Sequence, residues 1–212
     1  MIPRLHVVTD DRVIGLEDFL VRAQEVLELG AHVALHVRGP GTTGRSLSDL
    51  AVALRGPAAA SGAKLLVNDR ADIALTLRLD GVHVGRRSLP VADVRALLGP
   101  DRLVGASVHG VDEARDADRA GADFLFVGSV WASPSHADRG GAGPGLIREV
   151  ADAVAAPLLG IGGVTPERVD EILRAGGHGA AVISGIWYAP SSGDAARAYL
   201  QALSGPLRSL SE

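Results

Sequence analysis

The chain has 212 residues, carries a formal net charge of −4, and is 47 % hydrophobic, 3 % aromatic and free of cysteine. This length suits one large domain, the lack of cysteine excludes disulfides and thiolate metal sites, and mild acidity without blocks of like charge argues against nucleic acid or an anionic membrane surface as partner. No apolar run reaches the roughly 18 residues of a membrane span, and the N-terminal stretch is too short and charged for a signal peptide, so we expect a cytoplasmic protein.

Short β-branched runs alternate with helical patterns along the whole chain. The helical patterns place apolar residues at i, i+3 and i+4, as in residues 16–29 and in residues 166–176, which Thr165 precedes as N-cap. Glycines before several strand runs, such as Gly121 and Gly176, suit helix C-caps. The expected strands are residues 4–10, 32–38, 64–68, 81–85, 102–108, 124–130, 157–163 and 179–185.

Eight alternating units of this kind predict parallel strands joined by right-handed crossovers. Such units close most economically into a (β/α)8 TIM barrel, which we expect as a single α/β domain over residues 1–212. An open doubly wound sheet is the alternative. It usually needs fewer strands, and no glycine-rich dinucleotide fingerprint follows the first strand here.

Polar and small residues follow almost every expected strand, where a barrel carries its functional groups. The last two strand ends hold Gly162, Gly163, Ser184 and Gly185, whose small size lets backbone N–H groups approach an anion. Barrels often bind phosphate at this position. We therefore expect a phosphate site, with tight helix–strand packing, which glycine also permits, as the alternative.

The second expected strand ends in a charged residue. Strand alternation places Ala34, His36 and Arg38 on one face, opposite an apolar face that should contact the helices. His36 and Arg38 should therefore point into the barrel or its mouth. A buried arginine without an anion is costly, which predicts a bound anion, with an ion pair to Asp10 or Asp69 as the alternative.

Two further strands carry polar groups of open role. His83 should point inward, and for a lone inward histidine a satisfied core residue is the favoured interpretation. Asn68 and Asp69 either bind a magnesium-bridged phosphate or cap the helix that starts near Arg70.

Residues 128–143, GSVWASPSHADRGGAG, form a long irregular connection of the kind that serves as a lid or binding loop. We expect a lid in which Trp131 walls a ring-binding pocket. Ser133 and Ser135 would donate to phosphate or carboxylate oxygens, and His136 would carry a proton near neutral pH. The alternative is a surface loop without function, with Trp131 packed on a helix.

An ordered set of motifs resembles the thiamine-phosphate synthase/TenI superfamily: VNDR at 67–70, DGVHVG at 80–85, GASVH at 105–109, GIGG at 160–163 and VISG at 182–185. The resemblance implies a (β/α)8 barrel that handles thiazole phosphate in thiamine biosynthesis. Two activities occur in the superfamily. Thiamine-phosphate synthase joins a pyrimidine diphosphate to thiazole phosphate with Mg²⁺, whereas TenI-type tautomerase shifts a proton in a thiazole carboxylate phosphate.

Carried over position by position, the resemblance implies three groups of functional residues. The contacts to thiazole phosphate correspond to Gly163, Ile183 and Ser184. The contacts of the synthase to the diphosphate correspond to Arg38, Asn68 and Ser107, and one of its Mg²⁺ ligands corresponds to Asp69.

Departures from the synthase pattern remove charge. His36 stands where that pattern has Gln, Pro40 and His136 replace two lysines, and Ser88 replaces an Mg²⁺-binding Asp. A departing diphosphate needs its charge neutralised, so these changes predict weak Mg²⁺ binding and negligible condensation. LHVRG at 35–39 is similar to the TenI pattern instead, but Ser129 stands where the tautomerase has its proton-carrying His.

We therefore expect a TenI-like thiazole tautomerase, or a related proton-transfer enzyme, acting on a small heterocyclic phosphate. Arg38 would hold a substrate carboxylate, and His136, or else His36, would carry the proton. No cofactor is expected, with Mg²⁺ only for a synthase, and homo-oligomerisation is left open. The alternatives are thiamine-phosphate synthase and a non-catalytic phosphate-binding or regulatory protein. The expected phosphate contacts are Gly162, Gly163, Ile183, Ser184 and Gly185, and the expected substrate contacts are Asn68, Ser107, Ser129, Trp131, Ser133 and Ser135.

Overall fold

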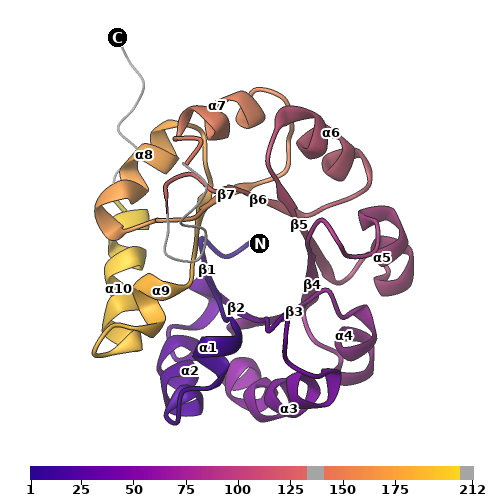
Figure 1. The fold of residues 1–212 in the computed structure, drawn as a ribbon, viewed down its shortest axis with the longest axis vertical. Helices are drawn as coiled ribbons and strands as arrows, with labels where there is room; N and C mark the ends of the chain where they lie inside the picture. The colour runs from indigo at the N-terminus through magenta and orange to yellow at the C-terminus, as the bar shows by residue number, and fades with distance from the viewer. Residues whose placement is uncertain (133–140, 206–212) are drawn as a thin grey trace.

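Eight parallel strands form the centre of the structure, a computed structural model that describes residues 1–132 and 141–205. The strands pair in chain order, and the sheet closes because β8 pairs with β1. Figure 1 shows them as an inner ring surrounded by helices. The expected (β/α)8 barrel is confirmed. The strands are β1 (Leu5–Val8), β2 (Val33–Val37), β3 (Lys64–Asn68), β4 (Gly81–Val84), β5 (Leu103–Val108), β6 (Phe124–Gly128), β7 (Leu158–Ile161) and β8 (Gly179–Val182).

Helices connect successive strands and cover the outside of the ring (Figure 1). The α-helices are α1 (Asp11–Ile14), α2 (Phe19–Leu27), α3 (Gly44–Ser61), α4 (Ala71–Leu77), α5 (Val91–Leu98), α6 (Val111–Arg119), α7 (Gly145–Ala151), α8 (Val169–Arg174), α9 (Ser184–Trp187) and α10 (Ser192–Leu203). The described residues also form the short 3₁₀ helices η1 (Gly30–His32) and η3 (Pro166–Arg168). Within the described residues, no helix is both long enough and apolar enough to cross a membrane.

Several strands end earlier than the sequence predicts, and the first strand shows one reason. The expected strand 4–10 stops at Val8. Asp10 instead caps the unexpected helix α1 by accepting a hydrogen bond from Val13 N at 2.9 Å. Gly121 and Gly176 both have φ of 90°, as expected of glycines that turn the chain from a helix into a strand.

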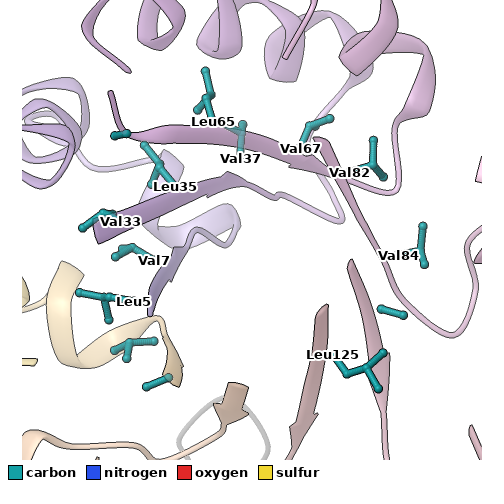
Figure 2. Close-up of a cluster of buried hydrophobic side chains, with 14 of the residues drawn as sticks. Leu5, Val7, Val33, Leu35, Val37, Leu65, Val67, Val82, Val84 and Leu125 are labelled. Atoms are coloured by element: carbon teal, nitrogen blue, oxygen red, sulfur yellow. The ribbon is translucent and has the colours of Figure 1, made fainter. Parts of the chain in front are cut away.

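The main hydrophobic core lies between the strands and the helices. Outward-facing residues at alternate strand positions are fully buried there, and Figure 2 shows them pointing toward the helices. Burying each such Val or Leu stabilises the fold by roughly 1.5–3 kcal/mol. The alternating apolar residues seen in the sequence therefore form the layer that packs strands against helices. Residues in this layer include Leu5, Val7, Val33, Leu35, Val37, Leu65, Val67, Val82, Val84 and Leu125.

A second, smaller core fills the interior of the barrel. Phe124 and Phe126 of β6 lie there against the rings of three buried histidines, and the closest pair, His83 and Phe126, has ring centroids 4.0 Å apart. Gly105 on β5 makes room for these rings, since a Cβ atom there would collide with Phe124 and lie 2.7 Å from His83 Nδ1. The interior is thus filled by rings rather than by branched aliphatic side chains alone.

Candidate active site

The turn after β7 brings unpaired backbone N–H groups to one side of the barrel mouth. Gly162 and Gly163 have φ of 96° and 62°, a backbone conformation that favours glycine. The carbonyl oxygen of Gly162 accepts from Trp131 N at 3.0 Å, and that of Gly163 accepts from Arg168 Nη1 at 2.7 Å. In a trans peptide the next N–H points the opposite way. The N–H groups of Gly163 and Val164 therefore face away from these partners, and neither donates to an acceptor in the described residues.

The end of β8 supplies further N–H groups next to this turn. β7 and β8 are neighbours, with Ile161 opposite Ala181, so both strand ends meet at the mouth. Ile183 is the N-cap residue of α9, and the first N–H groups of that helix, from Ser184 and Gly185, have no backbone acceptor in the described part of the chain. Together, the two strand ends form a group of donors suited to an anion.

Packing also requires these glycines. A Cβ atom at Gly163 would lie 2.6 Å from the carbonyl oxygen of Ala132, and one at Gly185 would collide with Tyr199 Oη. Tight packing, the alternative that the sequence left open, is therefore confirmed at these residues, and anion binding stays a prediction. Close packing is what holds the N–H groups in place.

Two residues that sequence analysis did not single out support the turn after β7. Tyr199 of α10 is 2 % exposed and donates through Oη to Val164 O at 2.9 Å. Arg168 donates to Gly163 O and holds its guanidinium carbon 5.1 Å from the ring centroid of Trp131. Neither residue belongs to a motif at a strand end, so no local sequence signal distinguished them from ordinary helix residues.

The loop after β6 contributes to the same side of the mouth. Ser129 lies beside the turn, since a Cβ atom at Gly162 would come 2.8 Å from Ser129 Cβ. Trp131 packs partly against the main core, and Arg168 covers one face of its ring. The expected lid residues Ser133, Ser135 and His136 lie outside the described residues.

Arg38 stands at the end of β2, on the part of the mouth away from β7. Thr9 binds its backbone on both sides, with Arg38 N donating to Thr9 Oγ1 at 2.8 Å and Thr9 Oγ1 donating to Arg38 O at 2.7 Å. The expected alternative, an ion pair with Asp10 or Asp69, is absent among the described residues. Its guanidinium is close enough to His83 to contribute to the lowered pKa of that ring. An arginine placed in this way suits an anionic ligand.

Asp69 follows β3 and is bonded to the loop after β4. Its φ is 63°, and its Oδ1 accepts from Gly85 N at 3.1 Å and from the hydroxyl of Ser88. Oδ2 has no hydrogen-bond partner in the part of the chain that the structure describes. Neither Asn68 nor Asp69 caps α4, whose N-cap residue is Arg70. The capping alternative is therefore wrong, and Oδ2 is the oxygen of the Asp69 carboxylate that has no partner in the described residues.

Ser107 on β5 is bonded to the buried ring of His83. The distance from Ser107 Oγ to His83 Nε2 is 2.8 Å, and His83 Nδ1 is buried without a partner in the described residues. Burial lowers the pKa of His83 well below its ordinary value, so the ring is neutral. A proton on Nδ1 would be a buried donor without an acceptor, so the favoured tautomer carries it on Nε2. Ser107 then accepts from the ring and keeps its own O–H for a ligand.

His36 points into the barrel as expected and is fully buried. Its Nε2 lies 2.8 Å from His6 Nδ1, and its Nδ1 lies 3.3 Å from Asn68 Oδ1. Burial lowers the pKa of His36 to about 3. A ring of this pKa is neutral near pH 7 and is a poor proton donor there.

The fold and the mouth together define a class of protein, a (β/α)8 barrel whose mouth carries backbone N–H donors on one side and an arginine on another. The comparisons agree with this class. The family model described as thiamine monophosphate synthase matches residues 5–186. The chain therefore belongs to that family of thiamine-biosynthesis enzymes. The superfamily resemblance is thereby confirmed, whereas the preference for a TenI-like tautomerase is not.

Relatives of this chain are named as synthases. The thiamine-phosphate synthase of Chlorobium luteolum is 41 % identical over 200 residues, which cover 93 % of this chain and 92 % of the relative. That of Desulfitobacterium hafniense strain Y51 is 39 % identical over 183 residues, covering 86 % and 88 %. Among solved structures, thiamine phosphate pyrophosphorylase from Pyrococcus furiosus has a TM-score of 0.81 at 29 % identity and covers 94 % of this chain and 95 % of its own.

Proposed function

We propose that the protein is a thiamine-phosphate synthase, which joins hydroxymethylpyrimidine diphosphate to thiazole phosphate. The thiazole nitrogen forms a bond to the methylene carbon of the pyrimidine, the bond between that carbon and oxygen breaks, and diphosphate leaves with the bonding electron pair. The observation that carries the proposal is the high identity to proteins named thiamine-phosphate synthase along nearly the whole barrel. The two anion-binding sides of the mouth support it, because the reaction needs a monophosphate and a diphosphate at once.

Thiazole phosphate would bind at the β7–β8 side. The N–H groups of Gly163, Ser184 and Gly185 would donate to the phosphate oxygens. The Trp131 side chain stands beside this turn, where the heterocyclic ring would lie. These contacts hold the nucleophilic ring at a defined place, and such positioning is a large part of catalysis for a reaction between two bound substrates.

The diphosphate would bind across the mouth, on the β2–β5 side. Arg38 has no carboxylate partner in the described residues and would donate to the diphosphate oxygens, as would the hydroxyl of Ser107. Negative charge grows on the diphosphate as it departs, so a fixed guanidinium is worth more in the transition state than in the ground state.

Mg²⁺ fits this side of the mouth only as a partner of the diphosphate. No group of three or more His, Asp or Glu side chains that could hold a metal occurs in the described residues. Mg²⁺ often binds through one or two carboxylates plus substrate phosphates, and Asp69 offers one carboxylate oxygen, Oδ2, without a partner there. When bound, the ion would neutralise part of the diphosphate charge. We therefore expect weak Mg²⁺ binding without diphosphate.

Tautomerase-type proton transfer is the second candidate, and one observation favours it. Ser88 occupies the position of a second Mg²⁺ carboxylate and donates to Asp69 instead. Against it, Ser129 stands at the proton-carrying position, and His36 is buried and neutral.

The experiment that tests the proposed function is incubation of the purified protein with both substrate sets, with products separated by chromatography. Mg²⁺-dependent formation of thiamine phosphate supports the synthase. A proton-shifted thiazole alone favours the tautomerase, and no product from either set favours a binding protein.

Returning a carboxylate to position 88 should strengthen the use of Mg²⁺. In Ser88→Asp, a second carboxylate beside Asp69 should lower the Mg²⁺ concentration for half-maximal synthase activity by roughly tenfold, since Mg²⁺ would gain one charged ligand. Ser88→Asn, similar in size and uncharged, is the control and should not show this gain. Equal Mg²⁺ requirements in the two variants would contradict the assignment of Mg²⁺ to Asp69.

A further inference from the structure

A row of hydrogen bonds runs through the barrel interior from its N-terminal end to the mouth. Pro3 O lies 3.1 Å from His6 Nε2, His6 Nδ1 lies 2.8 Å from His36 Nε2, and His36 Nδ1 lies 3.3 Å from the side-chain amide of Asn68. Both histidines are fully buried, and Asn68 is 8 % exposed. Asn68 is the last residue of β3 and stands at the mouth.

The polarity of this row follows from its first member. A carbonyl oxygen only accepts, so His6 Nε2 carries a proton. Burial, followed by the nearby rings of His36 and His83, lowers the pKa of His6 well below its ordinary value. A neutral His6 with its proton on Nε2 has a bare Nδ1, which accepts. His36 must therefore donate from Nε2.

The same reasoning applies one step further along the row. His36 is neutral and already carries its proton on Nε2, so its Nδ1 is bare. The Asn68 atom nearest to it is Oδ1, which also only accepts. Two acceptors do not form a hydrogen bond. Either His36 takes a second proton inside an apolar interior, or the Asn68 amide is rotated by 180° so that Nδ2 donates to the ring. The second arrangement avoids a buried unpaired charge.

We propose that His6 and His36 are positioning residues that hold the Asn68 amide with Nδ2 toward the barrel interior and Oδ1 toward the mouth. Asn68 then presents an acceptor oxygen next to the carboxylate of Asp69. An acceptor oxygen cannot donate to the diphosphate, which is the contact that the resemblance implied for Asn68, and it instead fits a donor such as the amino group of an aminopyrimidine. This assigns His36 a role other than the proton carrier expected from sequence.

The first test needs no substrate and is independent of the proposed function. In protein labelled with ¹⁵N, two-dimensional spectra of the histidine rings report which ring nitrogen carries the proton. We expect His6 and His36 as neutral Nε2–H tautomers at pH 7. We also expect a scalar coupling across the hydrogen bond from His36 Nε2 to His6 Nδ1, and another from Asn68 Nδ2 to His36 Nδ1. A doubly protonated His36, or a proton on its Nδ1, would overturn the proposal.

The second test rests on the proposed function and uses two variants of equal size. In His36→Gln, the side-chain oxygen can still accept from Asn68 Nδ2, whereas the thioether in His36→Met is only a weak acceptor. We expect kcat/KM for the pyrimidine diphosphate to fall roughly tenfold in His36→Met relative to His36→Gln. The KM for thiazole phosphate should stay unchanged in both, because that substrate binds at Gly163 and Ser184 across the mouth.

The outcomes separate the possible failures. Equal kcat/KM values in the two variants, or a parallel loss for both substrates, would show a merely structural role for His36 and contradict the proposal. If neither variant folds, the ring tautomers of His6 and His36 in the native protein decide whether the proposal holds. If the native protein makes no thiamine phosphate, the proposed function fails, whereas the orientation of Asn68 is still decided by the scalar couplings.

Discussion

Tyr199 shows how one side chain outside the mouth controls the groups at its edge. Its hydroxyl donates to Val164 O, directly after the glycine turn, and burial raises the pKa of Tyr199 to about 12. The same oxygen occupies the space that a Cβ atom at Gly185 would need. One phenol therefore contacts both halves of the β7–β8 donor group, so its hydroxyl determines how closely those halves approach.

Removing only that hydroxyl tests this relation. Tyr199→Phe leaves Val164 O buried without its donor, which should cost about 1–3 kcal/mol of unfolding free energy. The loosened turn should also weaken binding of thiazole phosphate several-fold by titration calorimetry. Tyr188→Phe is the matched control, because Tyr188 is 54 % exposed and stands at the end of α9. Unchanged phosphate-ester affinity in folded Tyr199→Phe would argue against this support of the site.

At the scale of elements, Arg168 couples the loop after β6 to the turn after β7. It stands at the end of η3, where its guanidinium bonds Gly163 O and covers the ring of Trp131. The hydrogen bond from a charged donor contributes about 1.5–3 kcal/mol, and the contact with the indole contributes about 0.5–1 kcal/mol at a partly exposed place. A planar guanidinium can make both contacts at once, which a lysine cannot.

Arg168→Lys should therefore uncouple the two loops while keeping the charge. We expect faster hydrogen exchange of the Trp131 N–H, altered Trp131 fluorescence, and weaker binding of thiazole phosphate. Arg174→Lys on α8 is the control. The Arg174 side chain pairs with exposed Asp170 and makes no hydrogen bond to the turn after β7 in the described residues. If exchange and fluorescence in the two variants are alike, Arg168 does not couple the loops.

At the scale of the whole molecule, three neutral histidines in the barrel make stability depend on pH. Burial lowers the pKa of His36 to about 3 and the pKa values of His6 and His83 well below 6.5. Below pH 6.5 the unfolded chain binds protons at these rings while the folded chain does not. The contribution of these rings to the free energy of unfolding is therefore fully present above pH 6.5 and falls as the pH drops toward 3. For His36 the loss is about 2 kcal/mol at pH 5.

Denaturant unfolding between pH 7 and pH 5 measures this dependence. The unfolding free energy should fall steadily over that range, and His36→Met should reduce the fall by about one third because it removes one of three such rings. His32→Gln, at an exposed position, should leave the pH dependence as it is. Carboxylates with a lowered pKa, such as those of Asp11 and Asp72, contribute stability that is lost only below this pH range. A native-like pH dependence in His36→Met would contradict the buried neutral ring.

Local patterns in the sequence determined the architecture and part of the site. Alternation at period two identified the outer faces of the strands, because every second strand residue must contact a helix. Residues such as Leu35 and Val37 accordingly lie in the main core, and His36 lies inside the barrel. The glycines after the last two strands marked the donor-rich turn, since a left-handed backbone and close approach both exclude larger residues.

Only the closed barrel decided which distant residues meet. The contacts between His6 and His36, between Ser88 and Asp69, and between Tyr199 and Val164 join residues 30, 19 and 35 positions apart. No local pattern encodes such contacts, because they depend on strand register, on closure between β8 and β1 and on the packing of helices over the mouth. The sequence therefore determined which groups the protein carries, whereas the tertiary structure decided their partners, because hydrogen bonds and burial act between neighbours in space rather than along the chain.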